Sequence, residues 1–440
     1  MLIDDYFTFI HPLIPIPHEP TFRHELEQRK DRTDRTFLAL LAGMIETLVS
    51  SFPRRPRQRL NETARAQFPS AKILVDRCHA VFVEARGIGF LDRDLDLHDA
   101  CASYLAGLSA AYTFDLKRWR LYAGECVMIL RTLGFQKPEI RQQAEGSMPP
   151  VEGYINQQIG RRLFWLCFVG ALSVRQLGGT DSDVLMPNAH SEGLPPMAVE
   201  VDDVHIFYDG IARDNQQGVS IMTGFNWNVR IFQAFHYMTA IEMAIGQGVL
   251  YDWDRQRHSI RAALRDVKAI AQKIPAELRL QDYTSKYGEW PPRDPSVLRA
   301  YPALEKRVVQ YEIQKANIHA TQLATRSYLV ERFWNLYEIH EKIKSAASAS
   351  KKTENSEYYS SPTITFMANG IEDRFQQAQS ASVSDVHSPD AGERDMGIER
   401  ENIIRDMALL IRSINQVNME PNGHSFVSRA LLINLPQLMF

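Results

Sequence analysis

The sequence contains few cysteines, and no two of them are spaced as metal ligands. The chain of 440 residues carries four, at Cys78, Cys101, Cys126 and Cys167, and none forms a C-x-x-C motif. A secreted disulfide framework uses more cysteines in a shorter chain, so this pattern excludes that class. We expect four buried, reduced thiols that act as small apolar side chains.

The sequence also lacks an excess of charge of one sign. Lys and Arg number 50 against 53 Asp and Glu, which gives a formal net charge of −3 and a pI of about 6.5. A nucleic-acid-binding domain usually has a pI above about 9 or a marked basic face. The bulk composition therefore excludes a chain that is drawn to nucleic acid by its net charge.

No apolar run is long enough to cross a bilayer. The longest covers residues 163–174, between Arg162 and Arg175, whereas a transmembrane helix needs roughly 20 residues. Asp4 and Asp5 fall where the apolar core of a signal peptide would begin. We therefore expect no membrane partner, and a buried helix at residues 163–174.

Strand-like alternation is almost absent, and helical periodicity recurs along the chain instead. Apolar residues at i, i+3, i+4 and i+7 predict a first helix that is capped by Thr33 or Asp34 and ends at Phe52. A second lies between Ser70 and Gly87. Further helices are predicted over residues 97–112, 116–133, 156–177, 228–251, 255–274, 296–337 and 400–417. The fold class is therefore all-α and multi-helical.

Proline excludes a helix over residues 12–20. Residues 12–20, with the sequence PLIPIPHEP, contain four prolines, each of which fixes φ and removes a hydrogen-bond donor. We predict an extended strap whose apolar side chains Leu13, Ile14 and Ile16 pack against a helical body. His11 and His18 lie beside these prolines, and we expect each to bond a backbone carbonyl rather than a metal.

Other stretches interrupt the helices and divide the chain. Residues 180–204, rich in Pro, Gly and Asp, and residues 278–294 predict surface loops. The Ser-rich residues that follow the last long helix have too few aliphatic side chains to offset chain entropy. We predict a helical domain over 1–344, a disordered Ser-rich linker over 345–394 and a C-terminal helical segment over 395–440.

Several acidic and histidine motifs fail the tests of the chemistry that they suggest. The run from Asp92 has Leu97 and Ser103 where a calcium loop needs Gly and Glu. Asp202 and Asp203 have no matching acid one turn later, as a magnesium–diphosphate site would require. His98 and Cys101 lie one turn apart, but no second pair completes a zinc site.

The strongest positive cluster is a short run that contains Arg54, Arg55, Arg57 and Arg59. One interpretation is a solvated loop between two helices. The alternative is a nuclear-import signal or a patch that contacts phosphate.

Two segments carry an ordered set of motifs. Residues 3–23 hold an aromatic helix start, a His-Pro strap and a later phenylalanine, and residues 159–179 hold an R-R-x-F-W element and a Leu-Gly turn. The matching residues are Tyr6, Phe7, His11, Pro12, Phe22, Arg161, Arg162, Phe164, Trp165 and Gly178. A Leu-Pro-x-x-Leu-x-Leu-like stretch follows at residues 274–280. Over about residues 3–330, this set resembles the regulatory middle region of fungal zinc-cluster (Zn2Cys6) transcription factors.

The resemblance implies a nuclear transcription regulator that controls target genes, and not an enzyme. Its partners would be a second copy of the chain or a full-length regulator, together with co-regulators and a small-molecule effector. The zinc cluster that precedes this region in the family is not among these residues, so zinc and DNA binding are implied only through that cluster. No cofactor is expected in the chain itself. An all-α enzyme with a hydrophobic pocket and a passive helical scaffold are the alternatives.

The resemblance gives the matched residues a structural role. Phe164 and Trp165 are expected in the core, while Arg161 and Arg162 reach back to acids or carbonyls and position the helices. The family usually carries an Asp about six residues after the tryptophan, and this chain has Ala171 there. A salt-bridge partner of the arginines is therefore expected to be missing.

Overall fold

The computed structural model describes residues 2–135, 153–177, 194–212, 218–236, 252–280, 302–353 and 391–423, and the structural statements below concern these residues. The α-helices are α1 (Leu2–Asp5), α2 (Glu19–Glu27), α3 (Arg35–Ser51), α4 (Arg54–Arg59), α5 (Glu62–Gln67), α6 (Ala71–Arg86), α7 (Leu97–Tyr112), α8 (Leu116–Thr132), α10 (Gly153–Gln176), α11 (Ile221–Gln233), α13 (Trp253–Gln272), α15 (Pro302–Thr353), α17 (Ala391–Ser413) and α18 (Gln416–Met419). Single helical turns occur at Tyr6–Ile10, Lys30–Arg32, Phe90–Asp92, Asp203–His205, Ala276–Leu278 and Glu420–Asn422. The strands in these residues form one antiparallel hairpin, β1 (Ile206–Phe207) with β2 (Gly210–Ile211). The all-α prediction is confirmed.

Local capping sets the ends of the predicted helices. Asp34 Oδ1 accepts hydrogen bonds from the amides of Thr36 and Phe37 and starts α3. Asp96 caps α7, and the Asp99 carboxylate bonds back to the amide of Asp96. The acidic run that fails as a calcium loop therefore serves as a capping box, in which two otherwise unpaired amide groups are satisfied.

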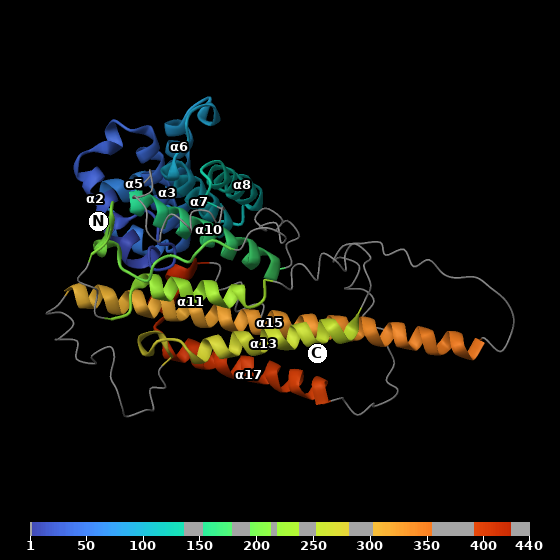
Figure 1. Ribbon diagram of the computed structural model, residues 1–440. Coiled ribbons are helices and arrows are strands. Elements are labelled where there is room, and N and C mark those ends of the chain that lie inside the picture. The colour runs from blue at the N-terminus through green and yellow to red at the C-terminus, as the bar shows by residue number, and fades with distance from the viewer. Residues whose placement is uncertain are drawn as a thin grey trace.

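The helices form two neighbouring groups (Figure 1). Helices α3, α6, α7 and α8 pack together as one bundle, while α11, α13 and α17 lie along the long helix α15. Helix α10 contacts α7 and α8 on one side and α11 and α15 on the other. One continuous apolar core runs through both groups, so α10 is the element that joins them.

The Pro-rich strap has the predicted form over residues 11–18, but Glu19 and Pro20, which were predicted as part of it, begin α2. Proline is tolerated there because the amide groups of a first helical turn have no intrahelical partner. Residues 11–18 contain turns and extended backbone, and α2 begins only at Glu19. Ile14 and Ile16 are buried in the main core, and Leu13 packs against it. The strap is therefore held by apolar contacts with the helical body, as predicted.

The C-terminal boundaries differ from those predicted for the linker. Helix α15 continues to Thr353, and α17 begins at Ala391, so both helices extend into the segment 345–394. Residues 354–390 lie outside the described residues, and the disordered linker stays a prediction. None of the helices described is long and apolar enough to cross a membrane.

Candidate functional site

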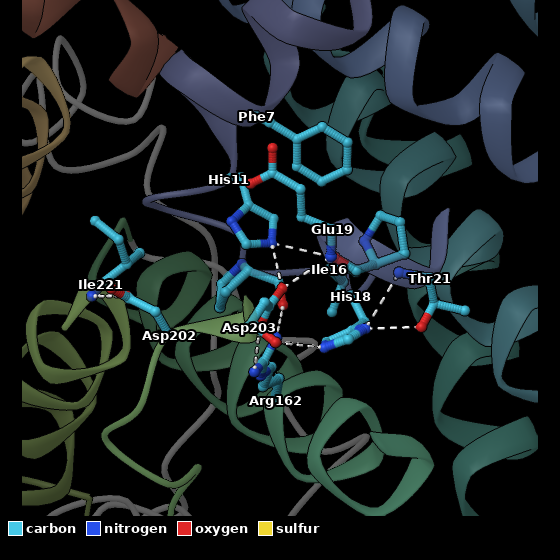
Figure 2. A network of polar contacts seen from close by, with 12 residues as sticks. Phe7, His11, Ile16, His18, Glu19, Thr21, Arg162, Asp202, Asp203 and Ile221 are labelled. Atoms are coloured by element: carbon cyan, nitrogen blue, oxygen red, sulfur yellow. Dashed lines mark hydrogen bonds and ion pairs between the residues drawn. The ribbon is translucent and has the colours of Figure 1, made fainter. Parts of the chain in front are cut away.

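Arg162 belongs to a buried polar cluster where several chain segments meet, with Asp203 between it and the strap (Figure 2). The side chain comes from α10 and is completely buried. Its Nη2 donates to Asp203 Oδ1 at 2.6 Å, and its Nη1 donates to the Pro15 carbonyl at 3.1 Å. A buried guanidinium needs a charged partner and further hydrogen bonds, and this arrangement supplies both.

Asp203 joins Arg162 to the strap. Its second oxygen, Oδ2, accepts from the amide of Glu19 at 2.9 Å and lies 3.5 Å from His11 Nε2. Burial alone would raise the pKa of Asp203, but the charge of Arg162 and the hydrogen bond from His11 outweigh it and hold that pKa well below its usual range. The carboxylate of Asp203 is therefore ionised. We call the cluster of Arg162, Asp203, His11 and His18 the arginine–aspartate hub.

The two histidines of the hub bond to carbonyl oxygens, as predicted. His11 Nε2 lies 3.1 Å from the Pro17 carbonyl oxygen, and His18 Nε2 lies 2.9 Å from the backbone oxygen of Asp203. His18 Nδ1 accepts from the Thr21 amide and caps α2, so the ring proton is on Nε2. Burial lowers the pKa of His18, which keeps the imidazole neutral in this role.

Asp202, next to Asp203, secures a second set of helices. Its Oδ1 accepts from the amide of Ile221 at 2.9 Å, at the start of α11. The same carboxylate pairs with Arg307 of α15 through both guanidinium nitrogens. Two consecutive aspartates therefore connect the strap and α10 on one side with α11 and α15 on the other.

The aromatic residues of the family-like motifs surround the hub. Tyr6 Oη donates to the Ile16 carbonyl at 2.8 Å, and the rings of Phe7 and Phe22 lie 5.8 Å apart. Phe164 and Trp165 pack edge to face, and Trp165 Nε1 donates to the Pro196 carbonyl. All five aromatic residues named in the motifs, Tyr6, Phe7, Phe22, Phe164 and Trp165, are buried.

The remaining motif residues divide into three cases. Pro12 is buried, and its carbonyl accepts from Gln314 Nε2 at 2.9 Å. Arg161 lies half-buried on α10, and burial lowers its pKa. Its buried Nε has no hydrogen-bond partner among the described residues, so the expectation that Arg161 reaches an acid or a carbonyl is not met there. Gly178 lies outside the described residues. Arg162 does reach an acid and a carbonyl, and the partner that seemed to be missing at Ala171 is provided by Asp203.

Sequence reasoning did not find Asp203. It tested Asp202 and Asp203 only as ligands of a magnesium–diphosphate cluster, and Asp203 contacts Arg162 across 41 positions of the chain. No periodic or local signal connects residues at that separation. In the part of the chain that is described, no group of three His, Cys, Asp or Glu side chains is placed to hold a metal ion.

The arginine run is a helix, so its interpretation as a loop is wrong. Pro56 is the third residue of α4, where the missing amide would have no intrahelical partner in any case. Arg55 and Arg59 lie 3.6 and 3.3 Å from the carboxylate of Asp5, and Arg54 lies 3.0 Å from Glu420. Nuclear import through this run stays a prediction.

The four cysteines are free and buried, as predicted. Burial raises the pKa of the Cys78 thiol to about 12. The thiols of Cys126 and Cys167 touch, with 3.6 Å between their sulfur atoms. Since buried cysteines are inaccessible to reagents, we expect these residues to be unreactive in the folded protein.

Comparison of the chain with protein-family models, curated proteins and solved structures gave no match in any of the three. The likeness to fungal zinc-cluster regulators therefore rests on the sequence motifs.

Proposed function

We propose that this chain is the helical regulatory domain of a fungal transcription regulator and that it acts in the nucleus. The observation that carries the proposal is the meeting of the two motif segments. His11 and Pro12 of the first segment and Arg162 and Trp165 of the second belong to one buried assembly around the hub. Residues that match the family motifs at separate positions in the sequence thus pack in one buried cluster.

The hub gives this domain a physical means of coupling. Arg162 and Asp203 connect the strap with α10, and Asp202 connects the same loop with α11 and α15. Rigid elements joined by a buried charge network move together, so a ligand that displaces α15 would also displace the strap. In this proposal a small-molecule effector or a co-regulator acts on the long helices, and the strap and α3–α8 bundle respond.

The proposed partners follow from the same reading. The chain would associate with a second copy or with a full-length regulator, and that regulator's zinc cluster would supply the contact with DNA. Zinc and DNA binding are thus assigned to the zinc cluster of the family and not to the hub.

A tethering experiment tests this proposal. The chain is fused to an unrelated DNA-binding domain and directed to a reporter promoter, once with a silent promoter and once with an active one. We expect the fusion to change reporter transcript level relative to the DNA-binding domain alone. Asp203→Asn should abolish the change, while Glu200→Gln, at the pair with Arg230 that is about one-third exposed, should leave it intact.

The result against the proposal is a nuclear, folded fusion that alters neither reporter. A passive scaffold would give that result, and so would an enzyme that acts on a metabolite.

A further inference from the structure

A surface hollow between α4, α5 and the start of α6 gathers three arginine side chains. Arg54 and Arg57 line it from α4 and Arg65 lines it from α5, with Gln58 and Ala71 between them. The nuclear-import interpretation of the arginine run does not account for such a shape, since an import signal is read as an extended basic peptide. We call this feature the arginine hollow.

The spacing along α4 explains how the hollow forms. Arg55 and Arg59 are four residues apart, so they share one face of the helix, and both point to Asp5. Arg54 and Arg57 are three residues apart and share a different face, which lines the hollow. The run therefore has one face that anchors α4 to the body and a second face that is open to a ligand.

Positive charge in the hollow exceeds negative charge. Arg54 pairs with Glu420. Arg65 Nη2 donates to the Gln58 carbonyl at 3.2 Å, and among the described residues no carboxylate pairs with its charge. Arg57 is exposed and has no acidic partner within the described part of the chain. Three guanidinium groups thus face one carboxylate, and the net charge matches that of a dianion.

The first turn of α6 adds partial positive charge to the arginine hollow. Ala71 is the first residue of a 16-residue helix and lines the hollow. The amide groups of a first turn point away from the helix and carry about half a positive charge, which favours anions. Ser70 Oγ accepts from the Ile73 amide and fixes the orientation of this turn.

We propose that the arginine hollow binds a phosphate monoester. Guanidinium groups bind phosphate oxygens through paired N–H donors, and three of them around one site suit a dianion of this size. A DNA backbone would instead need a long row of cations. Beyond the hollow the positive charge is interrupted, because Lys72 pairs with Asp76 and Arg59 with Asp5.

The test is calorimetric titration of the full chain with O-phosphoserine and with inorganic phosphate, at constant ionic strength set by chloride. We expect saturable binding of both probes to one site. Arg57→Ala should weaken it about tenfold, the effect of losing one charge-assisted contact. Arg77→Ala removes an exposed arginine of α6 that does not line the hollow, so it should leave binding unchanged.

The relative affinity of the two probes identifies the source of the phosphate. Tighter binding of O-phosphoserine points to a phosphorylated protein segment, and tighter binding of inorganic phosphate points to a small phosphate-bearing metabolite. Absence of saturable binding would overturn the proposal, and so would equal losses in Arg57→Ala and Arg77→Ala. Binding of duplex DNA in preference to both probes would also contradict it. Arg57 is exposed and makes no ion pair with the residues that the structure describes, so none of these outcomes bears on the tethering result.

Discussion

Substitution of Asp203 by Asn should destabilise the folded chain strongly. The change keeps the shape of the side chain and removes its charge, which leaves Arg162 fully buried without a counter-ion. It also presents an NH2 group either to the guanidinium or to the Glu19 amide, both of which are donors. One hydrogen bond of the hub is therefore lost together with the ion pair.

The expected magnitude follows from the geometry. For charge centres about 4 Å apart and an effective dielectric constant of about 20, the attraction is about 4 kcal/mol. Removing one partner of a buried pair typically costs 3–5 kcal/mol, because the other charge stays buried. We therefore expect Asp203→Asn to lower the free energy of unfolding by about 3–5 kcal/mol.

Urea unfolding followed by circular dichroism measures this loss. Arg162→Met and the double variant complete a cycle, in which the double variant should lose less than the two single variants together. Glu200→Gln is the matched control, since its pair with Arg230 is about one-third exposed and should contribute at most about 1 kcal/mol. A loss below about 1 kcal/mol for Asp203→Asn would contradict a stabilising buried ion pair. Strictly additive effects would show that Arg162 and Asp203 are not energetically coupled.

Asp203 also makes the free energy of unfolding depend on pH in the acid range. Because the pKa of Asp203 is lowered by folding, its contribution is present above the unfolded carboxyl pKa near 4 and is lost as pH falls through the folded value. Asp203→Asn should therefore show a flatter decline of stability in acid than the natural chain.

Three further predictions concern other buried groups. Burial lowers the pKa of His319 to about 4 from about 6.5, so its contribution to stability is lost as pH falls between these values. The loss should reach about 3 kcal/mol near pH 4, and urea titrations of His319→Gln should lack it. Gly224→Ala should cost about 1–3 kcal/mol in thermal unfolding, since its Cβ would lie 2.2 Å from the Gln314 amide, which two hydrogen bonds hold in place. A thiol-specific disulfide reagent should label the four cysteines only in denaturant, and rapid labelling of the native chain would contradict their burial.

The helices that sequence predicted well have local signals at their ends. Asp34 and Ser70 are capping residues whose side chains bond amides two or three residues later, and Gly87 ends α6 with φ of +70°. These contacts involve only neighbouring residues, so the sequence contains all the information needed. The Pro-rich strap is equally local, because proline restricts its own backbone and that of the preceding residue.

The start of α11 was predicted too late, although Ser220 caps it with a local contact, in which its Oγ accepts from the Thr223 amide at 3.0 Å. The helix begins at Ile221, whereas the periodicity predicted a start at 228. Gly224 and Asn226 are weak helix formers, so the local preference for helix is low over these residues. Asn226 Nδ2 in fact donates to the Ala198 carbonyl at 2.8 Å, and this contact with a distant loop favours the helix. Tertiary packing thus adds to the local cap and offsets the weak helix preference of Gly224 and Asn226.

The sequence predicted only one of the two charged partners of the hub. The role of Arg162 as a residue that reaches acids and carbonyls could be stated from its motif, but its partner could not. Asp203 lies in an irregular loop, and its contacts with the strap and α10 arise only when separate segments pack together. A single sequence shows only the spacing of residues along the chain. The pair of Arg162 and Asp203, which comes from two separate segments, has no characteristic spacing.

Acute depletion of the chain tests the proposal that it regulates transcription. The chain is tagged for rapid degradation in its own host, and nascent RNA is sequenced within minutes of depletion, in parallel with a metabolite profile. We expect the synthesis of a discrete set of transcripts to change before any metabolite pool does. Unchanged nascent transcription, with an early change in a metabolite, would contradict it and point to an enzyme instead.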